Sequence, residues 1–215
     1  MNGIIEINYI IIGFTCVISF MAFNNPYWMF KLKHWPYQEE RHGEYYRWLT
    51  SGFLHGDFMH LIFNMLTLYY FGTYVEAWFT HVFPDFGGII YLLFYLISIV
   101  AASSATFYKF RNTQSFASIG ASGAVAAVLF ASILIFPTSS INFIFLPFID
   151  IPGFIFGALY LWFSAYEAKR GADNIDHTAH YFGALFGFFF PILLEPGLVP
   201  AFFAQLQLWF STLGV

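Results

Sequence analysis

Gly120-Ala121-Ser122-Gly123-Ala124 opens the stretch that decides the fold, because a predominantly apolar run, residues 125–136, follows it directly. A helix that begins near Ser122 would present free backbone N–H groups beside the serine hydroxyl. Such groups can stabilise an oxyanion, so Ser122 is a candidate nucleophile. The pentapeptide misses the Gly-x-Ser-x-Gly pattern of soluble hydrolases, because position 124 is Ala. Taken alone it favours a packing role, since small residues are common where membrane helices touch.

The composition assigns the chain to a membrane. Hydrophobic residues make up 59% and charged residues 9% of the 215 residues, and the mean hydropathy is +0.67. Soluble domains carry about 25% charged residues, so this chain cannot cover a globule with polar surface. Crossing the hydrocarbon layer takes about 20 apolar residues per helix. Six runs reach or approach this length, at residues 4–23, 58–79, 88–108, 120–136, 148–168 and 177–194.

These runs predict an all-α integral membrane protein built as a bundle of six transmembrane helices. Strands of a membrane barrel would alternate in segments of about ten residues, whereas these runs are longer and apolar on all sides. The start lacks the layout of a signal peptide, so we expect the first run to be retained. The net charge of -4 comes without a basic patch for nucleic acid. The single cysteine, Cys16, excludes an internal disulfide and a thiolate metal site, and we expect no metal ion or other cofactor.

Two segments outside the six runs carry separate predictions. Residues 24–57 combine cations with many Tyr and Trp side chains, which suits the membrane interface. We therefore expect this first loop to be embedded beside the bilayer, and a plain linker is the alternative. Residues 198–215 would be short for a seventh span, and we expect an interfacial helix there. The domain prediction is a six-helix core at residues 1–196 and a hydrophobic tail at 197–215.

A second motif, Asp176-His177-Thr178-Ala179-His180, supplies a candidate base for the serine. Histidine is the commonest residue that activates a serine nucleophile. His180, Gly183 and Gly187 share one helix face through i, i+3 and i+7 spacing, which would let this helix pack closely against the serine helix. His177 lies off that face and ranks second as the base. A capping or cavity-lining histidine is the structural alternative, although polar groups at membrane depth tend to be functional.

His60 and Asn64 form a third motif, one helical turn apart on one face. Both can donate hydrogen bonds, and neither is needed for packing in lipid. The alternative is interhelical hydrogen bonding that only joins helices. A metal site is disfavoured, because the pair lacks the third protein ligand of catalytic zinc sites. His42, His55 and His81 fall outside any shared stripe, and we interpret them as loop or interface residues.

The three motifs are expected at one depth in the membrane. The second, fourth and sixth helices all enter from the same side, and His60, Ser122 and His180 each stand within one turn of those starts. The chain therefore brings together a nucleophile, a base and oxyanion donors, which are the parts of an acyl-transfer site.

The motifs resemble those of the rhomboid intramembrane serine proteases. The resemblance spans residues 44–187, and its motifs are Arg47-Trp48, His60-Leu61-Ile62-Phe63-Asn64, Gly120-Ala121-Ser122-Gly123 and Ala179-His180-Tyr181-Phe182-Gly183-Ala184-Leu185-Phe186-Gly187. It implies a six-helix core, a Ser122–His180 dyad without a third acid, and an oxyanion hole formed by His60, Asn64 and backbone N–H groups near Ser122. It implies structural roles for Arg47, Trp48 and Glu76. The motif glycines are Gly120, Gly123, Gly183 and Gly187.

The resemblance implies a serine endopeptidase that hydrolyses peptide bonds in or near transmembrane segments of other membrane proteins. Asp176 departs from the family pattern, because many relatives carry glycine there, and its carboxylate could touch the dyad or merely meet water. Two other classes stay open. A catalytically silent rhomboid-like protein would bind transmembrane segments, and a transporter would favour broken helices in two matching halves. The retained Ser122 and His180 favour the enzyme, while the substrate and the oligomeric state stay open.

Two arguments about orientation conflict. All eight Lys and Arg fall on the loop side shared with the active site, at positions 31, 33, 41, 47, 109, 111, 169 and 170. The positive-inside rule would put that side in the cytoplasm. The resemblance to bacterial rhomboids puts the N-terminus inside and the active site outside. We expect a bacterial inner (plasma) membrane with an extracytoplasmic active site, because several of these cations lie in the first loop rather than in short free connections.

Overall fold

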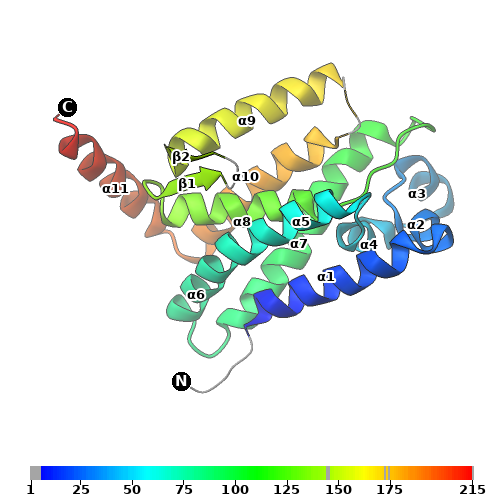
Figure 1. Ribbon diagram of the computed structural model, residues 1–215, viewed down its shortest axis with the longest axis horizontal. Coiled ribbons are helices and arrows are strands. Elements are labelled where there is room, and N and C mark those ends of the chain that lie inside the picture. Colours follow the sequence, from blue (N-terminus) through cyan, green and yellow to red (C-terminus); the bar gives the residue numbers. More distant parts are fainter. Residues whose placement is uncertain (1–5, 144–145, 172, 174, 215) are drawn as a thin grey trace.

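The computed structural model describes residues 6–143, 146–171, 173 and 175–214. Helices dominate the fold (Figure 1). The elements of the first part are α1 (Ile7–Phe23), α2 (Pro26–Leu32), α3 (Pro36–His42), α4 (Arg47–Thr50), the 3-10 turn η1 (Ser51–Phe53), α5 (Phe58–Thr67), the π-helical segment η2 (Leu68–Gly72) and α6 (Thr73–Val82). Those of the second part are α7 (Gly87–Phe110), α8 (Ser122–Ile135), β1 (Ser140–Phe143), β2 (Leu146–Pro152), α9 (Gly153–Arg170), α10 (His177–Leu194) and α11 (Leu198–Thr212).

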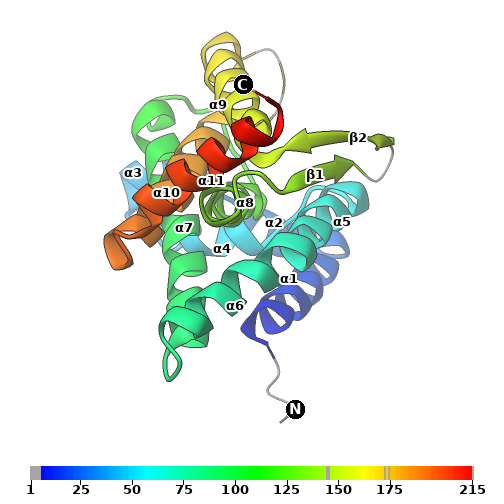
Figure 2. The same ribbon diagram turned by 90° about the vertical axis from the view of Figure 1, so that its left-hand side faces the viewer.

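Helix α8 lies at the centre of the molecule. Every residue from Gly123 to Ile135 is buried, and Figure 2, which looks along this helix, shows the other helices around it. A helix that is apolar on all sides is expected to be buried all round. Its main neighbours are α10 and α7. The serine at its N-terminus, Ser122, therefore stands at the end of the most enclosed helix of the fold.

Helices α8 and α10 approach closely because α10 has glycine at two contacts. A Cβ atom at Gly183 would collide with the carbonyl group of Gly123, and one at Gly187 would collide with that of Ala127. A Cβ atom at Gly123 would lie 2.6 Å from the Cβ atom of Ala102 in α7 and 3.3 Å from the Ala179 carbonyl oxygen in α10. A close-packed interior leaves no room for such additions. Small residues thus let α10 lie against the backbone of α8 and bring α7 close to both, as small residues do in membrane helix bundles.

The number of membrane spans is not confirmed. Within the described residues, two helices, α7 and α10, are long and apolar enough to cross a membrane by length and composition, and α1 and α8 are apolar but shorter. The expected second span, residues 58–79, is a helical path in which η2 separates α5 from α6. The structure confirms a mostly helical fold, whereas the count of six spans stays a prediction.

The prediction of a helix over residues 148–168 is wrong at its start, and the all-α class omits a hairpin. Strands β1 and β2 pair antiparallel, with Ser140 opposite Pro152, and α9 begins at Gly153. Proline disfavours the helical conformation in the residue before it, and Pro152 itself is extended, with φ -55° and ψ 137°. The helix therefore begins after Pro152. Hydropathy alone did not reveal this, because a short apolar run suits a buried strand as well as a helix.

Glu76 joins α6 to the start of α1. Its carboxylate oxygens accept hydrogen bonds from the backbone N–H groups of Ile7 and Asn8, each at 2.8 Å. These N–H groups belong to the first turn of α1, where no partner exists within the helix. Asn8 extends the network, because its amide donates to the Leu68 carbonyl oxygen at 2.8 Å and accepts from the Tyr91 hydroxyl at 2.7 Å. All of these contacts connect helices.

The first loop is folded, and Arg47 holds part of it together. The Arg47 side chain is buried and forms hydrogen bonds of 2.6 and 2.7 Å with the Glu44 carboxylate. It also donates to the backbone oxygens of Phe30 and Lys33, at 2.9 and 3.0 Å. Arg47 is the first residue of α4, and Phe30 and Lys33 lie in and directly after α2, so the guanidinium connects two separate parts of the loop.

A second network in the loop is centred on Glu39, which is fully buried. Its carboxylate pairs with Nδ1 of His34 at 2.7 Å and accepts from the Trp35 backbone N–H at 2.7 Å and from Nε1 of Trp48 at 2.9 Å. Buried charges persist when they are paired in this way. The loop is thus a compact folded unit, and its position beside the bilayer stays a prediction.

The tail forms α11, which extends from one end of the molecule (Figure 1). Most of its residues are exposed, and Leu198 is its buried residue. Gln205 donates to the Ile135 carbonyl oxygen at 3.1 Å, and the ring of Trp209 packs edge-on against Phe154. The division into a core at residues 1–196 and an interfacial tail at 197–215 stays a prediction.

Candidate active site

The structure brings Ser122 and His180 together. Nε2 of His180 and Oγ of Ser122 lie 2.8 Å apart, which is a hydrogen-bond distance. Ser122 is the first residue of α8, and His180 lies in the first turn of α10. The glycine contacts between the two helices allow this approach. An imidazole at this distance can accept the proton of the hydroxyl.

Asp176 fixes the start of α10. Its carboxylate accepts from the backbone N–H of Ala179 at 2.9 Å, as an N-cap residue does. It also accepts from the hydroxyls of Thr106 in α7 and Ser118 before α8, each at 2.9 Å. The carboxylate therefore bonds to three segments around the dyad rather than to the side chains of the dyad. The sequence left open whether this carboxylate touches the dyad or meets water, and the structure shows it bonded to groups around the dyad.

Gly120 keeps a space free between His60 and Ser122. A Cβ atom at Gly120 would lie 2.9 Å from Nε2 of His60 and 3.6 Å from Oγ of Ser122. The φ angle of Gly120 is +132°, a conformation that favours glycine over other residues. Any side chain at this position would occupy the gap between the ring nitrogen and the hydroxyl. In acyl transfer, an oxyanion needs such a gap, lined by hydrogen-bond donors.

Asn64 lies one turn beyond His60 on α5 and is 6% exposed. Its Nδ2 atom donates to the backbone oxygen of His60 at 3.2 Å. Asn64 therefore shares a face of α5 with His60, as the i, i+4 spacing predicts, and its amide is bonded to its own helix.

His55 contacts the His60 ring, a role that the sequence analysis did not assign to it. It lies in the connection before α5, as expected of a loop residue, but it is fully buried. Its ring packs edge-on against that of His60, with centroids 4.9 Å apart, and its Nδ1 pairs with the Ser19 hydroxyl of α1 at 2.9 Å. Burial, and to a smaller extent His60, lower the pKa of His55 to about 3, with Asp57 acting in the opposite direction. A neutral His55 therefore supports the His60 ring without adding charge.

His177, ranked second as the base, has another partner. Its Nε2 atom pairs with the Asp173 carboxylate at 3.1 Å, and its ring centroid lies 5.7 Å from that of His180. His42 and His81 are exposed, as expected of loop or interface residues.

A small cavity with both polar and apolar lining residues reaches the serine. It has a volume of about 30 Å³, and its lining includes His34, Ser51, Ser118 and Asp176 together with Ser122. A water molecule needs about 10–15 Å³ by this kind of measure and several polar partners. The cavity therefore has room for water next to the hydroxyl.

Comparisons with known proteins give one consistent family. A family model described as "Rhomboid domain" matches residues 42–196, more than half of the chain. "RHOMBOID-like protein 12, mitochondrial" of Arabidopsis thaliana is 29% identical over 153 residues, which cover 66% of this chain and 44% of the relative. "Rhomboid protease GluP" of Bacillus subtilis is 33% identical over 147 residues, 68% of this chain and 25% of the relative. "Rhomboid protease GlpG" of Haemophilus influenzae is 31% identical over 98 residues, 46% of this chain and 45% of the relative.

The matched region contains the site residues from His55 to His180, whereas His34, which lines the cavity, lies before it. The chain spans less than half the length of each of these relatives. The extent of the family match is decisive: this chain belongs to the rhomboid family of membrane-embedded proteins, which includes intramembrane proteases.

Proposed function

We propose that this chain is an intramembrane serine endopeptidase that hydrolyses peptide bonds in or near transmembrane segments of other membrane proteins. The observation that carries the proposal is the 2.8 Å distance between Oγ of Ser122 and Nε2 of His180. Family membership supports the same chemistry, because two of the relatives are named rhomboid proteases.

In the proposed reaction Oγ of Ser122 attacks the carbonyl carbon of the peptide bond. Nε2 of His180 takes the hydroxyl proton and then gives it to the leaving amine, which leaves an acyl group on the serine. His60, Asn64 and backbone N–H groups at the start of α8 hold the negative charge of the tetrahedral intermediate. A water molecule, activated by His180, then hydrolyses the ester and restores the free serine. The cavity that reaches Ser122, which has room for water, supports this last step.

Substrate entry is proposed beside α9. This helix lies at the edge of the molecule, above α10 in Figure 1, and exposes the aromatic side chains of Trp162, Phe163 and Tyr166. A transmembrane segment has its peptide bonds enclosed in helical hydrogen bonds. It must therefore unwind locally between α9 and its neighbours before Ser122 can attack.

A fluorophosphonate probe tests the proposal. It should modify Ser122 of the purified protein, as read by mass spectrometry, and the modification should vanish in Ser122→Ala and fall steeply in His180→Ala. Ser132→Ala, a buried serine of the same helix, is the matched control and should be labelled like the unmodified chain. Equal labelling of Ser122 in His180→Ala would contradict the dyad. A folded chain without any labelling would favour the silent protein that binds transmembrane segments.

The proposed topology has six spans and an extracytoplasmic active site in a bacterial plasma membrane. Cysteine accessibility tests it. A Cys16→Ser background removes the single native cysteine, and Lys31→Cys then reports on the active-site side. We expect labelling of intact cells by an impermeant maleimide, because the first loop would face outward. Asp85→Cys, an exposed site between α6 and α7, should show the opposite pattern. Labelling of Lys31→Cys that requires opened cells would reverse the orientation.

A further inference from the structure

The ring of His60, a proposed oxyanion donor, is not held by a hydrogen bond of its own. The backbone of His60 is fixed, because its N–H donates to the Asp57 carboxylate at 2.8 Å. Among the residues that the structure describes, neither ring nitrogen of His60 has a hydrogen-bond partner. Rotation of the ring would turn Nε2 away from the space beside Gly120, which a Cβ atom would occupy at 2.9 Å from Nε2. Another contact must therefore fix the ring if Nε2 is to bind an oxyanion.

His55 supplies such a contact. Its ring packs edge-on against the His60 ring, with centroids 4.9 Å apart and an angle of 74° between the planes. His55 is fully buried, so its own ring is enclosed by the protein. A close-packed interior leaves little room for side chains to move. The His55 ring therefore limits the rotation of the His60 ring.

Ser19 of α1 fixes the His55 ring and its tautomer. Oγ of Ser19 lies 2.9 Å from the Phe53 carbonyl oxygen and 2.9 Å from Nδ1 of His55. A serine hydroxyl has one proton to donate, and a carbonyl oxygen can only accept. Both bonds form together only when the hydroxyl donates to Phe53 and accepts from Nδ1–H of His55. His55 therefore has its proton on Nδ1, and its Nε2 keeps a lone pair.

His55 stays neutral in this arrangement. Its Nε2 atom is buried and has no hydrogen-bond partner in the described part of the chain, so no acceptor is present for a second proton. Burial, and to a smaller extent His60, lower the pKa of His55 to about 3, with Asp57 acting in the opposite direction. The bond from Nδ1–H to Ser19 therefore persists throughout the neutral pH range.

We propose that His55, held by Ser19, is a positioning residue that orients the His60 ring toward the oxyanion. The contacts run from the Ser19 hydroxyl to the His55 ring, from there to the His60 ring, and end at the space beside Gly120. Helix α1 thereby contributes to the active site through Ser19. The inference rests on the proposed function, because the orientation of His60 affects catalysis only in a chain that cleaves.

Two variants test this role on the full chain in detergent. Ser19→Ala removes the acceptor of Nδ1–H, whereas His55→Asn keeps a donor for Ser19 but removes the ring that packs on His60. Each should lower kcat on a reporter transmembrane segment by about 10- to 100-fold with little change in KM, because a misplaced donor is lost chiefly in the transition state. Ser98→Ala removes a buried hydroxyl of α7 that bonds to its own helix, and this control should keep normal kcat.

A His60→Ala background separates positioning from stability. If Ser19 and His55 act through His60, neither change should lower kcat further in a chain that already lacks the His60 ring. Loss of the buried hydrogen bond in Ser19→Ala should still lower the thermal midpoint in both backgrounds. An equal factor of loss in kcat with and without the His60 ring would assign both residues to general stability and overturn the inference. Normal kcat in folded His55→Asn would overturn it as well.

Nitrogen NMR of the chain with isotope-labelled histidine checks the tautomer independently of turnover. We expect His55, assigned by the signal missing in His55→Asn, to be neutral and protonated at Nδ1 at about pH 6–8, and Ser19→Ala to lose this preference. Protonation of His55 at Nε2 would overturn the inference. If the unmodified chain does not cleave, the proposed function fails and the role of His55 fails with it. If the unmodified chain cleaves and His55 fails the test in the His60→Ala background, the inference alone fails and the function stands.

Discussion

Ser122→Ala and His180→Ala should each abolish measurable cleavage of a reporter transmembrane segment while the protein stays folded. In serine proteases that use a histidine base, loss of either group lowers kcat by about 10⁴–10⁶. The double variant should add little to either single one, because nucleophile and base act as a unit. The measurement is kcat on purified protein in detergent, with the thermal midpoint recorded alongside.

The structure explains why these two variants should fold. Ser122 and His180 stand at the ends of helices, and the contacts that hold α8 to α10 come from Gly183 and Gly187 further along. Ser132→Ala and His81→Ala are the controls for loss of a serine and a histidine elsewhere, and both should keep full activity. Robust cleavage by Ser122→Ala would end the protease assignment.

Much of the fold followed from hydropathy, because helices in lipid must be long apolar runs that satisfy their own backbones. The runs at 88–108 and 177–194 correspond closely to α7 and α10. What hydropathy missed are departures from a single regular helix. The hairpin before α9 depends on Pro152, and η2 interrupts the α5–α6 path. Hydropathy averages over residues and is insensitive to such local backbone changes.

The candidate site could be predicted where spacing along one helix carried the information. The i, i+3 and i+7 pattern of His180, Gly183 and Gly187 indicated which face of α10 meets α8, and both glycines lie at that contact. His55 was missed because it lies before the start of α5. Helical periodicity therefore does not relate it to His60. Asp57, which caps α5 by accepting from the His60 N–H at 2.8 Å, marks the start of that helix.

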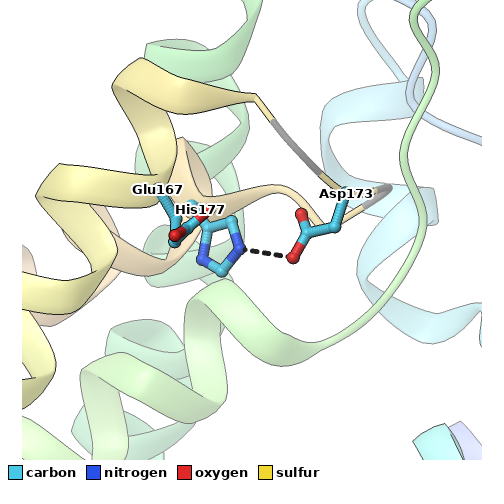
Figure 3. Close-up of side chains that lie close together, drawn as sticks. All are labelled: Glu167, Asp173 and His177. Carbon is cyan, nitrogen blue, oxygen red and sulfur yellow. Dashed lines mark hydrogen bonds and ion pairs between the residues drawn. The ribbon is translucent and has the colours of Figure 1, made fainter.

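The pair formed by Asp173 and His177 shows the same limit (Figure 3). Helical periodicity predicts which residues share one face of a helix. A connection between helices has no such period and can place its residues in many ways. Asp173 pairs with His177 at 3.1 Å although it precedes α10, which begins at His177, so no helical periodicity predicts the contact. Residues gathered across a connection are therefore the part of a site that needs a structure.

Asn64→Ala should lower kcat by about 10²–10³, the usual cost of losing one oxyanion donor, with little change in KM. The reason is that a bond to the oxyanion forms chiefly in the transition state. Nδ2 of Asn64 donates to the His60 backbone oxygen at 3.2 Å. In a regular helix that oxygen also accepts the backbone N–H of the fourth following residue. The side-chain bond of Asn64 lies within α5, and even a hydrogen bond between membrane helices contributes only about 0.6 kcal/mol on average, so the thermal midpoint should barely shift.

The same helix offers a matched control for Asn64. Thr67 donates its hydroxyl to the Phe63 backbone oxygen at 2.8 Å, which is the same bond to the fourth preceding residue. Thr67→Ala removes this bond away from the proposed oxyanion position and should leave kcat unchanged. His60→Ala should lower kcat as Asn64→Ala does, and the double variant should fall short of the product of both effects, since the donors serve one oxygen. A large fall in the midpoint of Asn64→Ala with near-normal kcat would instead assign Asn64 to helix packing.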